Sequence, residues 1–125
     1  MALTFRRHAG EFAVCRLAPD APMPDWALES LFSSVTRTPA ELSIVCEASR
    51  VPESIQAERG WACLELCGPF PFALTGILAS FLKPLAEAPV PIFALSTFDT
   101  DWILVPAAKL DAALQALRAA GHNES

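Results

Sequence analysis

The residues best suited to binding chemistry lie in the segment 96–101, Ser-Thr-Phe-Asp-Thr-Asp. Two carboxylates, Asp99 and Asp101, stand two residues apart beside three hydroxyl groups. Carboxylates and exposed carbonyl oxygens suit an ammonium or guanidinium group. The alternative is an ordinary hairpin turn at 99–101, in which Asp and Thr bond their own backbone. The rest of an EF-hand loop is absent, so the segment does not predict a calcium site.

A second candidate for ligand binding is the segment 72–77, where a proline-rich loop is expected to enter a helix. The first turn of a helix offers unpaired N–H groups and the positive end of the helix dipole, so it favours a carboxylate. Thr75 adds a hydroxyl, and Gly76 lets a ligand approach closely. Gly76 has an equally good structural explanation, because glycine also permits close packing of a helix on a strand. The preceding stretch 69–72, Pro-Phe-Pro-Phe, is interpreted as a hydrophobic plug or part of a subunit interface.

The remaining sequence carries no catalytic, metal or cofactor motif. His8 is expected in a turn and His122 in the terminal tail, which are poor places to hold a nucleophile–base pair. The chain has no Tyr, P-loop, G-x-S-x-G or G-x-G-x-x-G. We therefore expect no enzyme activity, no metal site and no cofactor.

The four cysteines are expected to be reduced, buried and unpaired. If Cys63 and Cys67 lie on one strand, they share a face but stand about 13 Å apart. That separation is too large for a disulfide or for one metal ion.

Charge and hydropathy narrow the function classes. Nine Lys and Arg face fourteen Asp and Glu, for a net charge of -5, and no basic stripe is present. Neither a nucleic acid nor an anionic membrane surface is expected as a partner. The longest uncharged run, 66–82, is short for a bilayer span and is interrupted by Gly and Pro. The N-terminus has no apolar segment after its charges, so a cytoplasmic location is expected.

The segments that must position the candidate residues form two similar halves. The patterns predict strands at 3–7 and 12–17 around a turn at 8–11, a helix at 26–31 capped by Asp25, strands at 32–36 and 41–47, a helix at 51–60, a strand at 61–67, a helix at 73–86, strands at 92–98 and 102–105, and a last helix from Pro106 to Gly121. We interpret this order as two tandem pseudo-repeats, a degenerate unit at 1–57 and a fuller one at 58–125. Chance similarity between two amphipathic halves is the alternative. The order predicts an α+β, ferredoxin-like fold, an antiparallel sheet with helices on one face.

Two stretches, 72–78 (Phe-Ala-Leu-Thr-Gly-Ile-Leu) and 91–105 (from Pro-Ile-Phe-Ala-Leu to Trp-Ile-Leu-Val), resemble ACT domains of the CASTOR type. These domains occur in small bacterial proteins and in the animal cytosolic arginine sensors. The resemblance implies a βαββαβ plan, paired units, and amino acids bound where two units meet. It also implies ligand contacts at Ile92, Thr97, Phe98 and Asp101. Such units end in a fourth strand, whereas residues 122–125 make a poor strand.

We therefore expect a regulatory protein that binds a small molecule, most simply an amino acid, with a cationic one as an option. The expected ligand-binding residues are Thr75, Gly76, Ile92, Thr97, Phe98, Asp99 and Asp101. A homodimer is expected, through sheet edges or helix packing, because few charges cover an apolar surface. The alternative is a ligand-free dimerisation or interaction module of the same fold.

Overall fold

The structure, a computed structural model, describes residues 1–125 and contains two compact units. The N-terminal unit is Gly10–Trp61, and the C-terminal unit combines Met1–Ala9 with Ala62–Ser125. The strands β1 (Thr4–Leu17) and β4 (Gln56–Leu66) each begin in one unit and end in the other. This division differs from the expected halves, 1–57 and 58–125, chiefly because the first nine residues belong with the second half of the chain.

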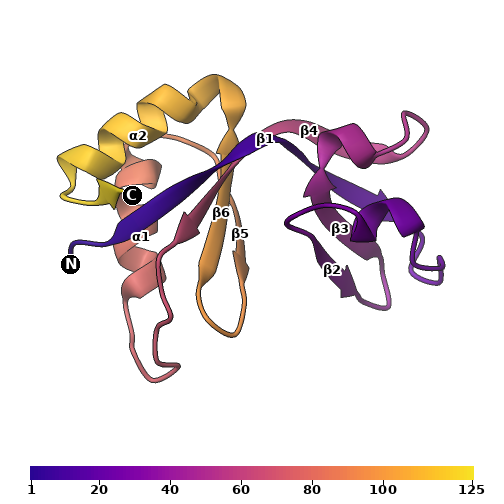
Figure 1. Ribbon diagram of the computed structural model, residues 1–125, viewed down its shortest axis with the longest axis horizontal. Coiled ribbons are helices and arrows are strands. Elements are labelled where there is room, and N and C mark those ends of the chain that lie inside the picture. The colour runs from indigo at the N-terminus through magenta and orange to yellow at the C-terminus, as the bar shows by residue number, and fades with distance from the viewer. The chain divides into compact units, whose positions relative to one another are not determined.

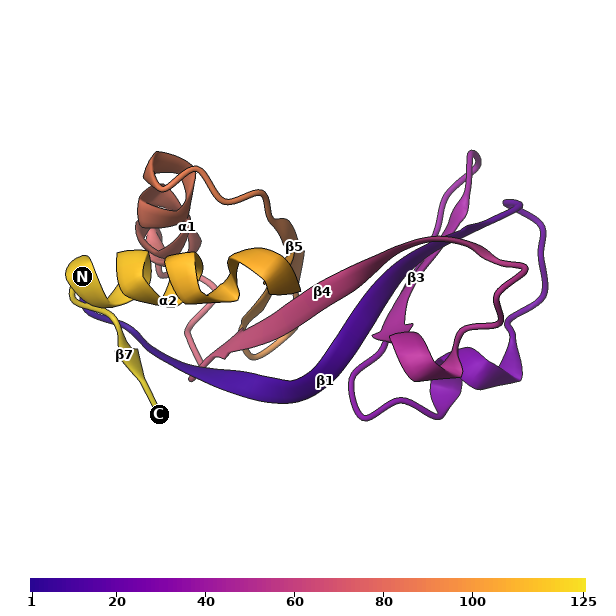
Figure 2. The ribbon, with the colours of Figure 1, turned by 90° about the horizontal axis from the view of Figure 1, so that it is seen from above.

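The C-terminal unit has the ferredoxin-like fold that the sequence predicts. After β4 come α1 (Ile77–Glu87), β5 (Phe93–Ser96), β6 (Asp101–Pro106), α2 (Leu110–Ala119) and β7 (Asn123–Glu124). The strand order is β1-β4-β6-β5, with β7 paired in parallel to β1 (Figure 1). Figure 2 shows α1 and α2 on the same side of these strands.

The core of this unit fills the space between the helices and one face of the sheet. Strand residues alternate between faces, so every second residue of β4 and β6 points into it. Phe5 and Phe81 pack edge to face, with ring centroids 5.5 Å apart. The buried side chains that form this core are Leu3, Phe5, Ala62, Leu64, Leu66, Ile77, Phe81, Leu85, Val90, Ile103, Val105, Ala113, Leu114 and Leu117.

The strand that lies next to β4, on the side away from β6, is the first half of β1. A strand that follows α2 in the chain does not take this place. The tail nevertheless forms the short strand β7, contrary to expectation. Asn123 N–H donates to Leu3 O at 2.8 Å and Ser125 N–H to Phe5 O at 2.7 Å. Glu124 pairs with Arg7 and Arg118, each at 2.9 Å. Apart from Arg118, these partners lie far away in sequence, so the local composition of the tail gives no sign of them.

The N-terminal unit repeats the plan with single 3-10 turns in place of helices. The second half of β1 is followed by a 3-10 turn at Asp25–Leu28, β2 (Ser34–Arg37), β3 (Leu42–Glu47) and a 3-10 turn at Ala48–Arg50. The strand order is β2-β3-β1-β4. Its core is formed by Ala13, Cys15, Ala27, Leu42, Ile44, Cys46, Ala48 and Val51.

Four predicted elements are wrong. The hairpin around 8–11 is one continuous strand, in which Gly10 takes a φ of 93° without a reversal. The helix at 26–31 is a single turn, and Asp25 lies inside it without capping it. The helix at 51–60 does not form, because β4 already begins at Gln56. The helix at 73–86 begins at Ile77, since Gly76 has a left-handed φ of 80°.

The four cysteines carry free thiols. Cys15 lies opposite Ile44 and Cys46 opposite Ala13, so the two cysteines are diagonal neighbours on adjacent strands. A hydrogen bond between these thiols lowers the pKa of Cys15 and raises that of Cys46. Burial raises the pKa of Cys63 to about 12. No helix has the length and apolar character needed to cross a bilayer.

Candidate ligand-binding site

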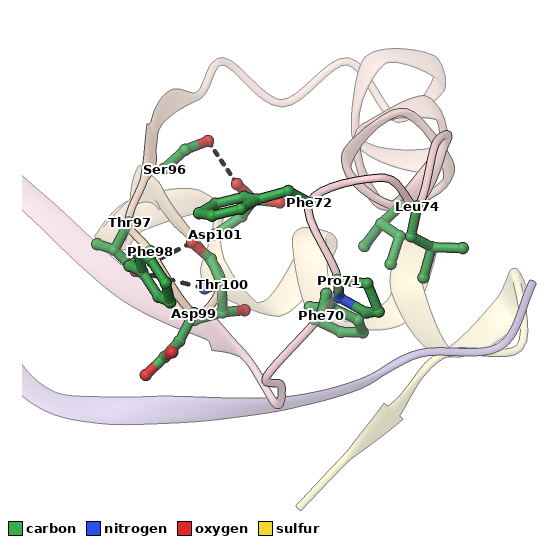
Figure 3. Close-up of a pocket in the computed structure, with 11 residues that line it drawn as sticks. Phe70, Pro71, Phe72, Leu74, Ser96, Thr97, Phe98, Asp99, Thr100 and Asp101 are labelled. Atoms are coloured by element: carbon green, nitrogen blue, oxygen red, sulfur yellow. Dashed lines mark hydrogen bonds between the residues drawn. The ribbon is translucent and has the colours of Figure 1, made fainter.

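A cavity of about 210 Å³ lies in the C-terminal unit between the β5–β6 hairpin and the loop from β4 to α1 (Figure 3). Four of the seven predicted site residues line it, namely Thr97, Phe98, Asp99 and Asp101. The other lining residues are Phe70, Pro71, Phe72, Leu74, Ile77, Ser96 and Thr100. Thr75, Gly76 and Ile92 are not among the residues that line it.

The hairpin has a four-residue turn, 97–100, and not the turn at 99–101 that the sequence suggests. Thr97 closes it, because its N–H and its Oγ1 both donate to Thr100 O, at 2.8 and 3.1 Å. Asp101 is therefore the first residue of β6 and is paired across the sheet with Ser96. It lies on the same face of β6 as Ile103 and Val105, which is the face that carries the core.

Three contacts fix the hairpin to the loop. Thr100, only 8% exposed, donates its Oγ1 proton to Leu66 O at 2.7 Å. Phe70 N–H donates to Asp99 O at 2.9 Å. A Cβ at Gly68 would stand 2.9 Å from the same carbonyl oxygen, so only glycine fits this approach. The walls of the cavity are thus held together by the fold before any ligand binds.

The two carboxylates differ in direction. Ser96 Oγ–H donates to Asp101 Oδ1, as the dashed line in Figure 3 shows, and Asp101 lines the same cavity as Phe72. In the same view the Asp99 carboxylate points away from Asp101 and from Phe72. The carboxylate that faces the cavity is therefore that of Asp101.

Aromatic side chains form the rim. Phe72 and Phe98 are 77% and 79% exposed, and their rings meet edge to face at 4.8 Å. Leu74, which also lines the cavity, is exposed as well. Ring faces attract cations as well as apolar groups, so this rim suits a ligand that carries both.

The N-terminus of α1 reaches one wall of the cavity through Ile77. The first bond of the helix joins Ser80 N–H to Gly76 O, at 2.9 Å. The N–H groups of the preceding residues therefore have no partner within the helix. The sequence predicts this feature but places it four residues too early. Phe70, Pro71 and Phe72, from the stretch 69–72 that is interpreted as a hydrophobic plug or part of a subunit interface, line the cavity. The sequence analysis does not include them among the site residues, although they lie next to segment 72–77.

At the corresponding place of the N-terminal unit, the residue that closes the hairpin turn on the first strand is an arginine. Arg37, the last residue of β2, donates from its guanidinium to Pro19 O at 2.5 Å and to Ala21 O at 2.8 Å. Nowhere in the chain do three or more His, Cys, Asp or Glu side chains gather in a way that could hold a metal ion.

The profile of the ACT domain matches residues 56–119, which is just over half of the chain. The chain belongs to the ACT domain family. A profile described as an N-terminal domain matches residues 10–54. The resemblance to CASTOR-type ACT domains is confirmed by the human protein CASTOR3P, which is 33% identical in an alignment of 87 residues that covers 59% of this chain and 53% of that protein. The chain thus spans about half the length of this curated relative.

Solved structures share the whole fold. Protein Atu0741 from Agobacterium tumefaciens is 37% identical, with a TM-score of 0.95, over 100% of this chain and 93% of that one. Protein VC0802 from Vibrio cholerae has a TM-score of 0.77 at 23% identity, over 96% and 91% of the two chains. The regulatory subunit of aspartate kinase from Thermus thermophilus has a TM-score of 0.60 at 13% identity, over 94% and 93%. The last two likenesses are of fold alone.

Proposed function

We propose that this ACT protein is a non-catalytic regulatory protein that binds an amino acid in the cavity beside Asp101. The observation that carries the proposal is a carboxylate on the core-facing side of β6, held by Ser96 at the edge of a preformed cavity. An exposed turn residue would need no such environment.

The groups around the cavity match the two ends of an amino acid. The Asp101 carboxylate suits a positively charged group. The N-terminus of α1, which lines the cavity through Ile77, suits a carboxylate. The rings of Phe72 and Phe98 suit the apolar part between them. A cavity of about 210 Å³ is small for a ligand pocket, which agrees with a ligand as small as a single amino acid.

Regulation requires that the bound amino acid change the affinity for a partner. The ACT family and the fold shared with an aspartate kinase regulatory subunit support this role. The proposal includes the cytoplasm as the place of action. It includes a homodimer as the working form. It also includes Thr75, Gly76 and Ile92, which do not line the cavity, as residues that contact the ligand once it is bound.

The apolar rim favours a second candidate, a ligand-free interaction module. Phe72, Leu74, Ile92 and Phe98 are all exposed in the C-terminal unit. Side chains of this kind are enriched where proteins meet. In that case the protein associates with no dependence on any amino acid.

A thermal-shift panel of the twenty amino acids separates the two candidates. A ligand at a hundredfold over its dissociation constant adds about 2.7 kcal/mol of stability. The matched control is Ser96→Arg, which places a guanidinium opposite Asp101 as Arg37 stands in the N-terminal unit. We expect at least one amino acid to stabilise the wild type and none to stabilise this variant. A flat panel, with a dimer seen by light scattering, would support the interaction module.

A further inference from the structure

The sheet of the C-terminal unit has an apolar face on the side away from α1 and α2, which we call the outer face (Figure 2). Trp102 and Leu104 point to it, because they alternate along β6 with residues of the core. Leu95 and Phe93 of β5 stand directly opposite these two residues and share the face. Leu104 is fully buried and the other three side chains are half-buried. A face in contact with water normally carries polar side chains, whereas strands covered on both faces are apolar throughout. The outer face of β5 and β6 therefore has the composition of a covered surface.

One row of side chains crosses the outer face from β1 to β5. His8 of β1 and Glu65 of β4 are in contact, with Nε2 and Oε1 2.8 Å apart. The His8 ring packs against Trp102 of β6, with ring centroids 5.0 Å apart and planes inclined by 31°. Leu95 of β5 stands opposite Trp102 and completes the row. Contacts within the unit hold these side chains, so ordering them costs little entropy when a partner binds.

Two charges of opposite sign lie beside this row. Arg6 is two residues before His8 on β1, so its exposed side chain lies on the same face. Its guanidinium contacts the Cys67 sulfur at 3.8 Å and pairs with no carboxylate. Glu65 stands on the neighbouring strand, with 20% of its side chain exposed. A twofold axis between β1 and β4 brings Arg6 of one copy to Glu65 of the other, and this contact then occurs twice. The outer face is therefore complementary to itself.

We propose that the outer face is the interface of a homodimer. Two copies bury Phe93, Leu95 and Trp102 against each other, and Arg6 of each copy binds Glu65 of the other. Tryptophan and arginine are enriched among the side chains that dominate the affinity of interfaces, and the opposite charges fix how the copies align. A second copy fits better than a strongly charged partner, because the face itself carries both signs of charge. This inference rests on the homodimer of the proposed function and names its surface.

The test is sedimentation equilibrium of the wild type and of charge-reversed variants, each alone and in equal mixture. The wild type is a dimer. In Arg6→Glu two carboxylates face each other across the interface, and in Glu65→Arg two guanidinium groups do, so each variant alone dissociates at least about tenfold more readily. Mixing the two variants restores the dimer, because both contacts of the mixed pair again join opposite charges. The matched controls are Lys109→Glu and Glu87→Arg, which reverse exposed charges next to α2 and at the end of α1 and dimerise as the wild type does.

Rescue by mixing is the decisive readout, because a variant that is merely misfolded is not repaired by a second one. The inference is overturned if either reversal alone leaves the dimer intact, if the mixture stays monomeric, or if the controls dissociate instead, which would place the interface on the helices. A wild type that is monomeric up to millimolar concentration overturns it together with the homodimer. The amino acid site is tested separately by the thermal-shift panel, since Asp101 lies on the core-facing side of β6 and Trp102 on the outer face. An amino acid that stabilises a monomeric wild type therefore leaves that site standing.

Discussion

The β2–β3 hairpin of the N-terminal unit and the β5–β6 hairpin of the C-terminal unit have the same kind of turn, but different residues close it. Each has a four-residue turn whose first residue is a threonine, Thr38 or Thr97. Thr38 N–H donates to Glu41 O at 2.9 Å, as Thr97 N–H donates to Thr100 O at 2.8 Å. The pairs that close the two turns differ, and they are Arg37 with Leu42 and Ser96 with Asp101.

The two closing pairs place different side chains at the ends of the two hairpins. In the N-terminal unit Leu42 is fully buried in the core and Arg37 reaches the loop carbonyls. In the C-terminal unit a carboxylate stands at the leucine position and a short serine at the arginine position. Where the N-terminal unit has the long side chain of Arg37, the C-terminal unit has the short side chain of Ser96, which lines the cavity.

The largest expected effect comes from exchanging the two closing residues. Leu42→Asp buries an unpaired charge among apolar side chains, so we expect it to lower the free energy of unfolding by at least about 3 kcal/mol. Asp101→Leu should change it by no more than about 1 kcal/mol, because the position is half-exposed and loses one hydrogen bond. Urea unfolding measures both. Equal losses of stability would mean that the two positions do not differ in their surroundings as described.

The second effect concerns the contacts that hold the loop between β4 and α1 against the β5–β6 hairpin. Gly68→Ala forces a methyl group against Asp99 O, at a starting separation of 2.9 Å. We expect a loss of about 1–3 kcal/mol, typical of overpacking, together with weaker binding of any ligand. Thr100→Val, which removes the bond to Leu66 O but keeps the side-chain shape, serves as the companion variant. An unchanged urea midpoint for Gly68→Ala would show that the loop does not pack tightly against the hairpin at Gly68.

A smaller effect is expected on the closed side of the comparison. Arg37→Ala removes two hydrogen bonds from an exposed side chain, so the cost should be about 0.5–1.5 kcal/mol. Arg16→Ala, which removes one exposed bond to Ala40 O, is the matched control. Denaturant unfolding of the two variants tests the order. A larger loss in the control would refute the role given to Arg37.

The smallest expected effect is a dependence on pH at the terminal strand. Hydrogen bonding to Arg7, and then to Arg118, holds the pKa of Glu124 below its usual value of 4.5. This stabilisation is therefore present above pH 4.5 and is lost as the pH falls through the lowered pKa. It amounts to less than about 1 kcal/mol, because both arginines are largely exposed. Glu124→Gln should flatten the acid limb of the stability curve, and an unaltered limb would contradict the assignment.

The sequence was informative where structure is local. The strand 41–47 and the turn before it are read correctly because alternation and a Thr-Pro turn act over a few residues. Likewise, all six residues of the segment 96–101, which the sequence singles out for binding, line the cavity. The weak strand at 122–125 and the long strand β1 could not be predicted in this way, since their hydrogen-bond partners lie far along the chain.

The bond between Ser96 and Asp101 could also not be predicted from the sequence. It depends on the register that sets the two residues opposite each other, and the expected turn at 99–101 is incompatible with that register. The same error made Asp99 and Asp101 look alike as turn residues. Only the strand pairing shows that one of them lies on the core-facing side of β6.

The most direct test of the account is calorimetric titration of the wild type, Asp101→Asn and Asp99→Asn with the amino acid that gives the largest thermal shift. Asp101→Asn keeps the shape of the side chain and removes the charge that faces the cavity. Because a charge-assisted hydrogen bond contributes about 1.5–3 kcal/mol, we expect the affinity to fall about tenfold to a hundredfold. Asp99→Asn should leave the affinity within about twofold of the wild type, since that carboxylate points away from the site and the change stays within about 0.5 kcal/mol. Equal affinities in all three proteins would contradict the account, because Asp101 would then be no more than a residue of the hairpin.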